Sequence, residues 1–209
     1  MPESHRYATV KIESTNSLLD EVRSCTLCAN QLEHGVRPVL QINPSARVLI
    51  AGQAPGSKVH ATGIAFNDPS GERLRDWMGI DRKTFYNDSI IAIVPMGFCY
   101  PGKGNSGDLP PLPVCAQTWR IKVLASMPNI SLTLAIGQYA QAWHIKQAGK
   151  NLTETVRAWK SQGADIMPLP HPSPRNNRWL KKNPWFEVEV LPALKQRVYR
   201  ALYGKERGN

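Results

Sequence analysis

Short apolar runs alternate along this chain with amphipathic segments, and most of the runs end at a glycine or a proline. Runs such as RVLIAG and SIIAIVP are too short for helices and are bounded by turn residues, which is typical of buried strands. Ser70 is the expected N-cap of one helix, and Gly79 is its expected end. The pattern predicts strands over 47–52, 89–95, 132–137 and 164–169, and helices over 13–24, 70–79, 116–126, 138–146 and 184–203.

Strands that alternate with helices predict a parallel sheet covered by helices on both faces. We therefore expect an α/β protein of three layers, α/β/α, with a central, mainly parallel four-stranded sheet. The 209 residues fit one domain, with an N-terminal helix at about 13–24 and a core over about 25–203. Ligands bind beyond the carboxyl ends of such strands, which directs attention to residues 52–56, the residues after Pro95, and residues 171–174.

The net charge of the chain favours one class of binding partner. Lys and Arg number 26 against 16 Asp and Glu, a formal net charge of +10. This excess suits a polyanion, because Lys and Arg that neutralise phosphates release condensed counterions; an ordinary basic surface is the alternative. Hydrophobic residues at 42% and charged residues at 20% exclude a disordered chain and a coiled coil.

The sequence offers no sign of a membrane or of export. No apolar run approaches the roughly 18–20 residues that span a bilayer. The first residues, MPESHRY, are polar and lack the apolar core of a signal peptide. We therefore expect a soluble cytoplasmic protein with no membrane partner.

The segment Gly52-Gln53-Ala54-Pro55-Gly56 follows the first predicted strand directly. Its glycines allow close approach of a ligand to the backbone, and Pro55 fixes one dihedral angle. The amide of Gln53 offers both a donor and an acceptor. An ordinary strand-ending turn has the same composition, and the segment is not a P-loop, because no Gly-Lys-Ser/Thr follows it.

The richest stretch is HPSPRNNRWLKK, residues 171–182. Prolines on both sides of Ser173 stiffen the backbone after the last predicted strand and hold His171 in a fixed direction. Four cations follow, interleaved with an aromatic residue: Arg175, Arg178, Trp179, Lys181 and Lys182. This composition is typical of a segment that binds phosphates and inserts a side chain into a base stack. A solvated charged loop is the alternative.

Four cysteines carry a further possibility. Cys25 and Cys28 form a C-x2-C pair, and Cys99 and Cys115 follow later in the chain. A chain of this size and pattern does not need disulfides. Thiolates that hold a metal, or plain buried thiols, are the two interpretations, and four cysteines also suit tetrahedral zinc.

These motifs together resemble the uracil-DNA glycosylase superfamily. Gly52–Gly56 after the first strand and HPSP at 171–174 after the fourth match its two signature motifs. Residues 63–71, GIAFNDPSG, are similar to the family segment that carries an aromatic which stacks on uracil, and residues 132–140 also follow the family pattern. The resemblance runs from about Cys25 to the final helix and implies the three-layer fold of that superfamily.

The cysteine spacing resembles the branch of this superfamily that carries an iron–sulfur cluster. The resemblance implies a [4Fe–4S] cluster on Cys25, Cys28, Cys99 and Cys115, with zinc as the chemical alternative. A cluster at these positions would fix the N-terminal helix and residues 100–113 near the edge that faces DNA.

The resemblance further implies a DNA glycosylase that acts as a monomer in base-excision repair. Such an enzyme hydrolyses the N-glycosidic bond of uracil, or of another deaminated base, after the base has been flipped out of DNA. His171 is the expected catalytic donor to the departing base, assisted by Gln53 and by backbone N–H groups of the turn. The expected contacts to the base come from Gly52, Ala54, Pro55, Gly56, Phe66, Asn67 and Asp68, and those to DNA from Ser173, Arg175, Arg178, Lys181 and Lys182.

Two positions depart from the family pattern and leave a second hypothesis, a catalytically weak or inactive nucleic-acid-binding member of the same fold. Gln53 stands where the cluster-bearing branch has Glu, and an amide cannot accept a proton as a carboxylate can. Pro95 stands where relatives have an Asn that reads the edge of uracil. Candidates to replace that Asn are Ser89, Asn87 and Asn67, while Asp68 could either activate water or cap the following helix.

Overall fold

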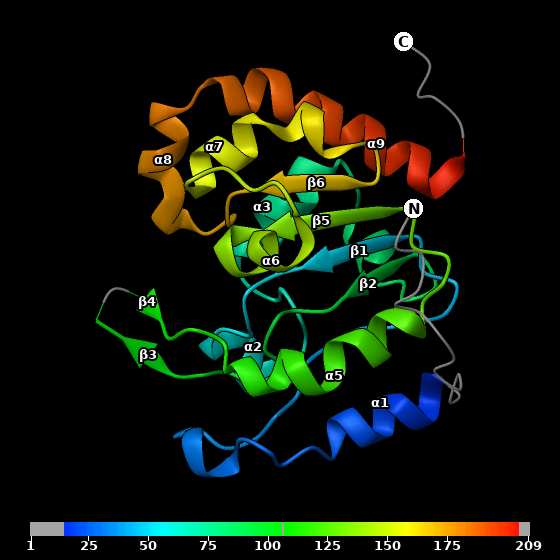
Figure 1. Cartoon of the computed structure of the whole chain (residues 1–209), viewed down its shortest axis with the longest axis vertical. Helices are drawn as coiled ribbons and strands as arrows, with labels where there is room; N and C mark the ends of the chain where they lie inside the picture. Colours follow the sequence, from blue (N-terminus) through cyan, green and yellow to red (C-terminus); the bar gives the residue numbers. More distant parts are fainter. Residues whose placement is uncertain (1–14, 106, 205–209) are drawn as a thin grey trace, which may run out of the picture.

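A four-stranded parallel sheet lies at the centre of the computed structural model, which describes residues 15–105 and 107–204 (Figure 1). Its strands run in the order β2-β1-β5-β6, and every neighbouring pair is parallel. A separate antiparallel hairpin, β3–β4, projects from the body of the molecule (Figure 1). The strands are β1 (Val48–Ala51), β2 (Ile91–Ile93), β3 (Lys103–Gly104), β4 (Gly107–Asp108), β5 (Leu132–Ile136) and β6 (Ile166–Leu169).

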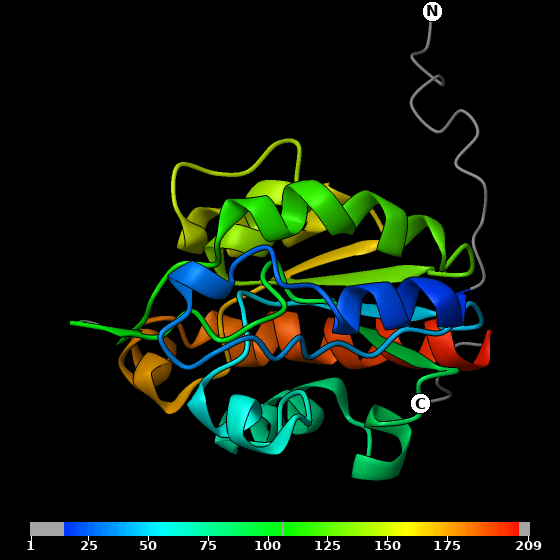
Figure 2. The same cartoon turned by 90° about the horizontal axis from the view of Figure 1, so that it is seen from below.

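Helices cover both faces of this sheet, with α5 and α6 on one side and α3 and α9 on the other (Figure 2). Within the described residues, every helix is too short or too polar to cross a membrane. The helices are α1 (Thr15–Arg23), α2 (Ser57–Thr62), α3 (Pro69–Met78), α4 (Arg82–Phe85), α5 (Pro113–Ala125), α6 (Gly137–His144), α7 (Leu152–Arg157), α8 (Asn177–Lys182) and α9 (Leu191–Tyr203).

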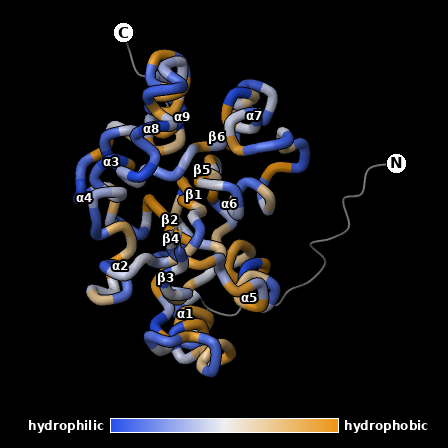
Figure 3. Tube along the Cα trace, turned by 90° about the vertical axis from the view of Figure 1, so that its left-hand side faces the viewer, coloured by the Kyte–Doolittle hydropathy of each residue, from blue (hydrophilic) through white to orange (hydrophobic). Residues whose placement is uncertain are grey.

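The central strands are almost entirely apolar, as is typical of strands buried on both faces, and Thr133 of β5 is the one polar exception in β1 and β5 (Figure 3). Side chains alternate across the sheet, so Val48 and Ile50 pack toward α3 and α9, whereas Leu49 packs toward α1 and α5. Burying one such side chain contributes about 1.5–3 kcal/mol. Leu74 and Leu194 meet the first face, each fully buried.

The three-layer fold and its parallel sheet are therefore confirmed. All four predicted strands are present within the expected ranges, and residues 13 and 14 of the first predicted helix lie outside the described part. The expected N-cap Ser70 is wrong, because α3 begins at Pro69 and its N-cap is Asp68, two residues before Ser70. The last predicted helix is in fact a π-helical turn over Phe186–Val190 that leads into α9. The short helices α2, α4, α7 and α8 and the hairpin were not predicted.

Phe66 is held in an unusual conformation at the start of α3. Its φ of 53° lies in the left-handed region, which a residue with a large side chain rarely adopts. Its ring packs edge-on against Phe85, with 6.1 Å between the ring centroids. The helix can approach this turn only through Gly71, because a Cβ there would lie 1.8 Å from the Phe66 carbonyl oxygen.

Arg120 is the largest fully buried side chain that carries a charge, and it lies between α5 and the end of β2. Its Nη1 donates to the carbonyl oxygens of Val94 and Pro95 at 3.3 and 3.1 Å. Its Nη2 faces Nε2 of His144, which must accept because the guanidinium can only donate. Burial, followed by the charge of Arg120, lowers the pKa of His144 from 6.5 to about 3. His144 is therefore neutral in the folded protein.

Gly71→Ala tests the close packing beneath Phe66. We expect the substitution to lower the free energy of unfolding by about 3 kcal/mol, because the added methyl group overlaps a backbone oxygen that cannot move away. Gly35→Ala is the matched control, since Gly35 has a φ of 78° but nothing within 4 Å of its Cβ position, and should cost only about 1 kcal/mol. Urea unfolding measures both, and equal losses would contradict the interpretation.

The buried His144 predicts a loss of stability in mild acid. The unfolded chain takes up a proton near pH 6.5, whereas the folded protein does so only near pH 3. The free energy of unfolding should therefore fall with decreasing pH below 6.5, by at most about 1.4 kcal/mol per pH unit for this proton. In His144→Gln the slope between about pH 5 and 6.5 should be shallower, and in the exposed-residue control His34→Gln it should be unchanged. An unaltered slope in His144→Gln would contradict the assignment.

Candidate active site

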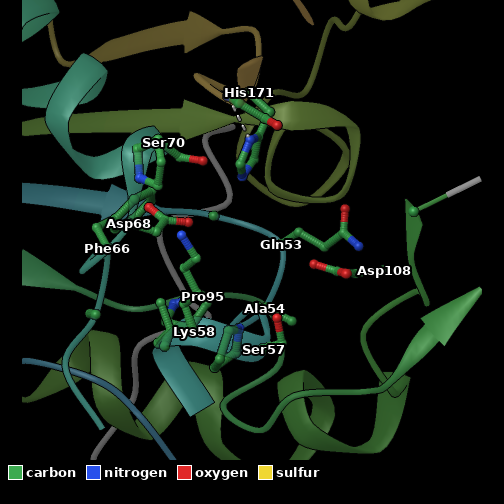
Figure 4. Close-up of a pocket in the computed structure, with 18 of the residues that line it drawn as sticks. Gln53, Ala54, Ser57, Lys58, Phe66, Asp68, Ser70, Pro95, Asp108 and His171 are labelled. Carbon is green, nitrogen blue, oxygen red and sulfur yellow. Dashed lines mark hydrogen bonds between the residues drawn. The ribbon is translucent and has the colours of Figure 1, made fainter. Parts of the chain in front are cut away.

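A cavity of about 460 Å³ opens at the carboxyl ends of β1, β2 and β6 (Figure 4). It brings together the turn after β1 and the loop after β6, which are far apart in the sequence. Its polar lining comes from several different segments of the chain. The lining residues named by the sequence analysis are Gly52, Gln53, Ala54, Pro55, Gly56, Phe66, Asp68, His171, Ser173 and Arg175.

His171 follows β6 and points its ring into this cavity (Figure 4). Its Nδ1 accepts the backbone N–H of Ser173 at 3.2 Å, and its carbonyl oxygen accepts from Nδ2 of Asn176 at 2.8 Å. Burial lowers the pKa of His171 below its ordinary value, against the opposing charges of Asp68 and Asp108. The ring is therefore neutral, and its one proton lies on Nε2, where it can be donated into the cavity.

The turn after β1 is braced by the chain that follows β2. The backbone N–H groups of Met96 and Gly97 donate to the carbonyl oxygens of Gly52 and Gln53, each at 2.9 Å. The side chain of Gln53 reaches the hairpin, where its Nε2 donates to the carbonyl oxygen of Leu109 at 3.0 Å. These contacts fix the turn as one wall of the cavity.

The opposite wall comes from the segment before α3. The tip of the Phe66 ring lies near Gly52, since a Cβ on that glycine would be 3.7 Å from it. Asp68 lines the cavity and also caps α3, because its Oδ1 accepts the backbone N–H of Gly71 at 2.9 Å. Two roles were considered for Asp68, activation of water and capping of the helix, and the structure shows the capping hydrogen bond. Ser70 lies buried in the same wall.

None of the three residues considered as readers of the uracil edge lines the cavity. Asn67 accepts from Nη2 of Arg82 at 3.0 Å. Ser89 Oγ donates to Asn87 Oδ1 at 2.6 Å, and both residues precede β2, at the opposite end of the strand from the cavity. Pro95 is itself part of the lining. These three expectations are therefore not supported by the geometry.

The basic segment divides between the cavity and the outer surface. Arg175 is exposed at the cavity rim, and its Nη1 lies 2.8 Å from the position that a Cβ on Gly107 would take. Arg178, Lys181 and Lys182 all lie on α8, exposed and outside the lining. The cavity thus has a cationic border on the side of α8.

Five polar residues of the lining were not predicted from the sequence: Ser57, Lys58, Ser70, Asp108 and Asn176. Ser57 and Lys58 begin α2, a helix too short for its period to be seen in the sequence. Asp108 lies on β4, within a stretch rich in glycine and proline for which no structure was expected. The glycines at 102 and 107, which both take positive φ, are the signal that marks a hairpin there.

All four cysteines line a second, smaller cavity of about 20 Å³ between the segment after α1 and the first turn of α5. Two sulfur atoms accept hydrogen bonds at 3.3 Å, Cys25 from Trp119 Nε1 and Cys115 from the backbone N–H of Phe98. Burial raises the pKa of Cys115 to about 12 and, to a lesser extent, raises those of Cys28 and Cys99.

The donor set of this second cavity suits a thiolate-bound group in its chemistry. Soft thiolates select zinc or iron–sulfur clusters, and N–H donors to the sulfur atoms are a regular feature of cluster sites. Among the described residues, no group of three or more His, Cys, Asp or Glu side chains is arranged as it would be around a bound metal ion. Free thiols of raised pKa become thiolates when a cation binds them.

Comparison with known protein families agrees with this arrangement. A family model described as the uracil DNA glycosylase superfamily matches residues 40–195. The matched region contains β1, the whole central sheet and every residue that lines the larger cavity apart from Val39. The chain therefore belongs to the uracil-DNA glycosylase superfamily.

Proposed function

We propose that this protein is a DNA glycosylase that hydrolyses the N-glycosidic bond of uracil, or of another deaminated base, flipped out of DNA during base-excision repair. The observation that carries the proposal is the shared cavity, in which the Gly52–Gly56 turn, Phe66 and His171 face one space of about 460 Å³. This volume falls within the range of small-molecule sites, about 300–1,000 Å³. An extruded base can be held there away from the duplex.

The chemistry requires a donor at the departing base more than it requires an acid. When the bond between base N1 and sugar C1′ breaks, the sugar becomes cationic and negative charge collects on the base, chiefly near O2. His171 suits this task, since its neutral ring presents Nε2–H while Ser173 holds Nδ1. A donor fixed in advance stabilises the developing charge without reorganisation. Phe66 would stack on the face of the extruded base.

The rim of the cavity supports DNA as the partner. Arg175 lies at the border of the cavity, from which it would fill the gap that a flipped base leaves. Arg178, Lys181 and Lys182 extend the positive surface along α8, where they would bind phosphates.

We further propose that Cys25, Cys28, Cys99 and Cys115 hold a [4Fe–4S] cluster with a structural role, zinc being the chemical competitor. The shared cavity and the N–H donors to two sulfur atoms support this assignment. A group bound there would join the segment after α1 to the start of α5, and so stabilise the side of the molecule that carries the hairpin.

His171→Ala tests the proposed chemistry. The substitution should lower the single-turnover rate of base release by about 10²–10³-fold, because it removes the donor to the departing base. The measurement uses single- and double-stranded oligonucleotides that contain uracil, hypoxanthine or xanthine. His34→Ala, an exposed histidine outside the cavity, is the control and should keep the wild-type rate.

The same assay separates the enzyme from a binding module. Salt-sensitive DNA binding without release of any of these bases by the wild-type protein would contradict the glycosylase and support the alternative, an inactive member of the fold. A His171→Ala variant that releases base at the wild-type rate would contradict the assigned donor.

The cysteine assignment predicts a brown protein with about four iron atoms per chain. Cys115→Ser should lose most of this iron and the broad visible absorption, because one ligand is removed. Trp119→Phe is the matched control, since it removes the N–H that faces Cys25 but leaves every thiol in place, and it should retain the iron. Elemental analysis of freshly purified protein measures both metals; one zinc per chain would instead favour the zinc alternative, and neither metal would contradict both.

A further inference from the structure

The hairpin carries a carboxylate into the cavity at the side where Gln53 lies. Asp108, on β4, lines the cavity beside Gln53 (Figure 4). Its Oδ2 lies 3.4 Å from the position that a Cβ on Gly56 would take, so the carboxylate faces the turn after β1 directly. Asp108 and His171 are also close enough to interact electrostatically. The hairpin is therefore part of the site.

Gln53 holds this hairpin in place and cannot itself act as a base. Its Nε2 donates to the carbonyl oxygen of Leu109, the residue next to Asp108. An ionised glutamate at this position has no hydrogen to donate and would repel both that carbonyl group and the Asp108 carboxylate. The amide at position 53 and the carboxylate at position 108 are thus complementary. Arg175 packs against Gly107 and braces the same hairpin from the side of the loop after β6.

The two carboxylates of the cavity differ in what they are free to do. Asp68 is engaged as the cap of α3, through the bond from Gly71 to its Oδ1. The carboxylate of Asp108 is exposed to water. In the part of the chain that the structure describes, no side chain or backbone group lies within hydrogen-bond or ion-pair distance of it. An exposed carboxylate that lines the cavity and has no protein partner is free to accept a hydrogen bond from a water molecule there, as a general base must.

We propose that Asp108 is the general base that activates the attacking water; the proposal rests on the proposed glycosylase function. The bond between base N1 and sugar C1′ breaks, and its electron pair leaves with the base. The oxygen of a water molecule forms the new bond to C1′, and Asp108 accepts the proton that this water loses. Solvent then takes that proton from Asp108 and supplies one to the released base anion, which leaves an abasic site and the neutral base.

Asp108→Asn tests this assignment on the oligonucleotide whose base the wild-type protein releases fastest. The single-turnover rate should fall by about 10²-fold, the lower end of the effect of a lost general base. Affinity for DNA that contains an uncleavable abasic-site analogue should stay within about twofold of the matched control. That control is Asp20→Asn, which removes the same charge from an exposed position on α1 and should keep the wild-type rate.

Rescue by azide distinguishes a general base from a residue that only supports the structure, because azide would not restore activity lost through a structural defect. This anion attacks C1′ without losing a proton and therefore needs no base. Added sodium azide, compared with sodium chloride at equal ionic strength, should raise base release by Asp108→Asn at least tenfold, whereas His171→Ala should not respond. Asp68→Asn retains a capping side chain, so its loss of rate should be smaller than that of Asp108→Asn.

The outcomes separate this proposal from the one on which it rests. A wild-type protein that releases no base overturns both. An active wild-type protein whose Asp108→Asn variant keeps the Asp20→Asn rate, or fails to respond to azide, overturns the assignment of Asp108 and leaves the glycosylase intact. A larger loss in Asp68→Asn than in Asp108→Asn would transfer the role of base to Asp68.

Discussion

The parallel pairing of β1, β5 and β6 is the constraint on which the site depends. Ala51 pairs with Ala135, and Ile136 pairs with Leu169, so these three strands end at one edge of the sheet. The turn after β1 and the loop after β6 must then leave the sheet side by side, whatever their separation in the sequence. The direction in which successive strands are added to the sheet also reverses at β1, which has β2 on one side and β5 on the other. Ligands bind at such switch points in open α/β sheets.

The fold could be predicted because each strand is buried on both faces. A strand of that kind is a continuous apolar run, and Val48–Ala51 is buried at every position. Parallel strands need a long crossover, so the helices between the runs followed from the strands. The edge that carries the site followed in turn, and with it the approach of Gly52–Gly56 to His171. The cavity could therefore be located from the topology of the sheet rather than from any single motif.

The features that could not be predicted depend on local geometry that leaves only a weak pattern in the sequence. The strands of the hairpin are two residues long, so no alternation of polar and apolar positions exists to mark Asp108. Ser70 and Asp68 are both residue types that cap helices well. Pro69 determines which of them is the N-cap, because proline favours the first position of a helix and so leaves Asp68 just before it. Asn87 and Ser89 precede β2 and so lie at its amino end, whereas only the carboxyl end of the strand reaches the cavity.

One helix connects the two cavities of the protein. Cys115 lies in the first turn of α5 and lines the cysteine cavity. Arg120, further along the same helix, donates to the carbonyl oxygen of Pro95 in the wall of the larger cavity. Burial lowers the pKa of Arg120 to about 10, which still leaves it charged at neutral pH, and a thiolate at Cys115 opposes that shift. A buried cation is costly without compensating charge, and among the described residues Nε of Arg120 has no hydrogen-bond partner. Because burial raises the pKa of Cys115 to about 12, the free thiol is neutral at neutral pH and does not supply this charge. A thiolate-bound group of the kind proposed for the cysteine cavity would supply it, and would then stabilise the side chain that donates to the wall of the larger cavity.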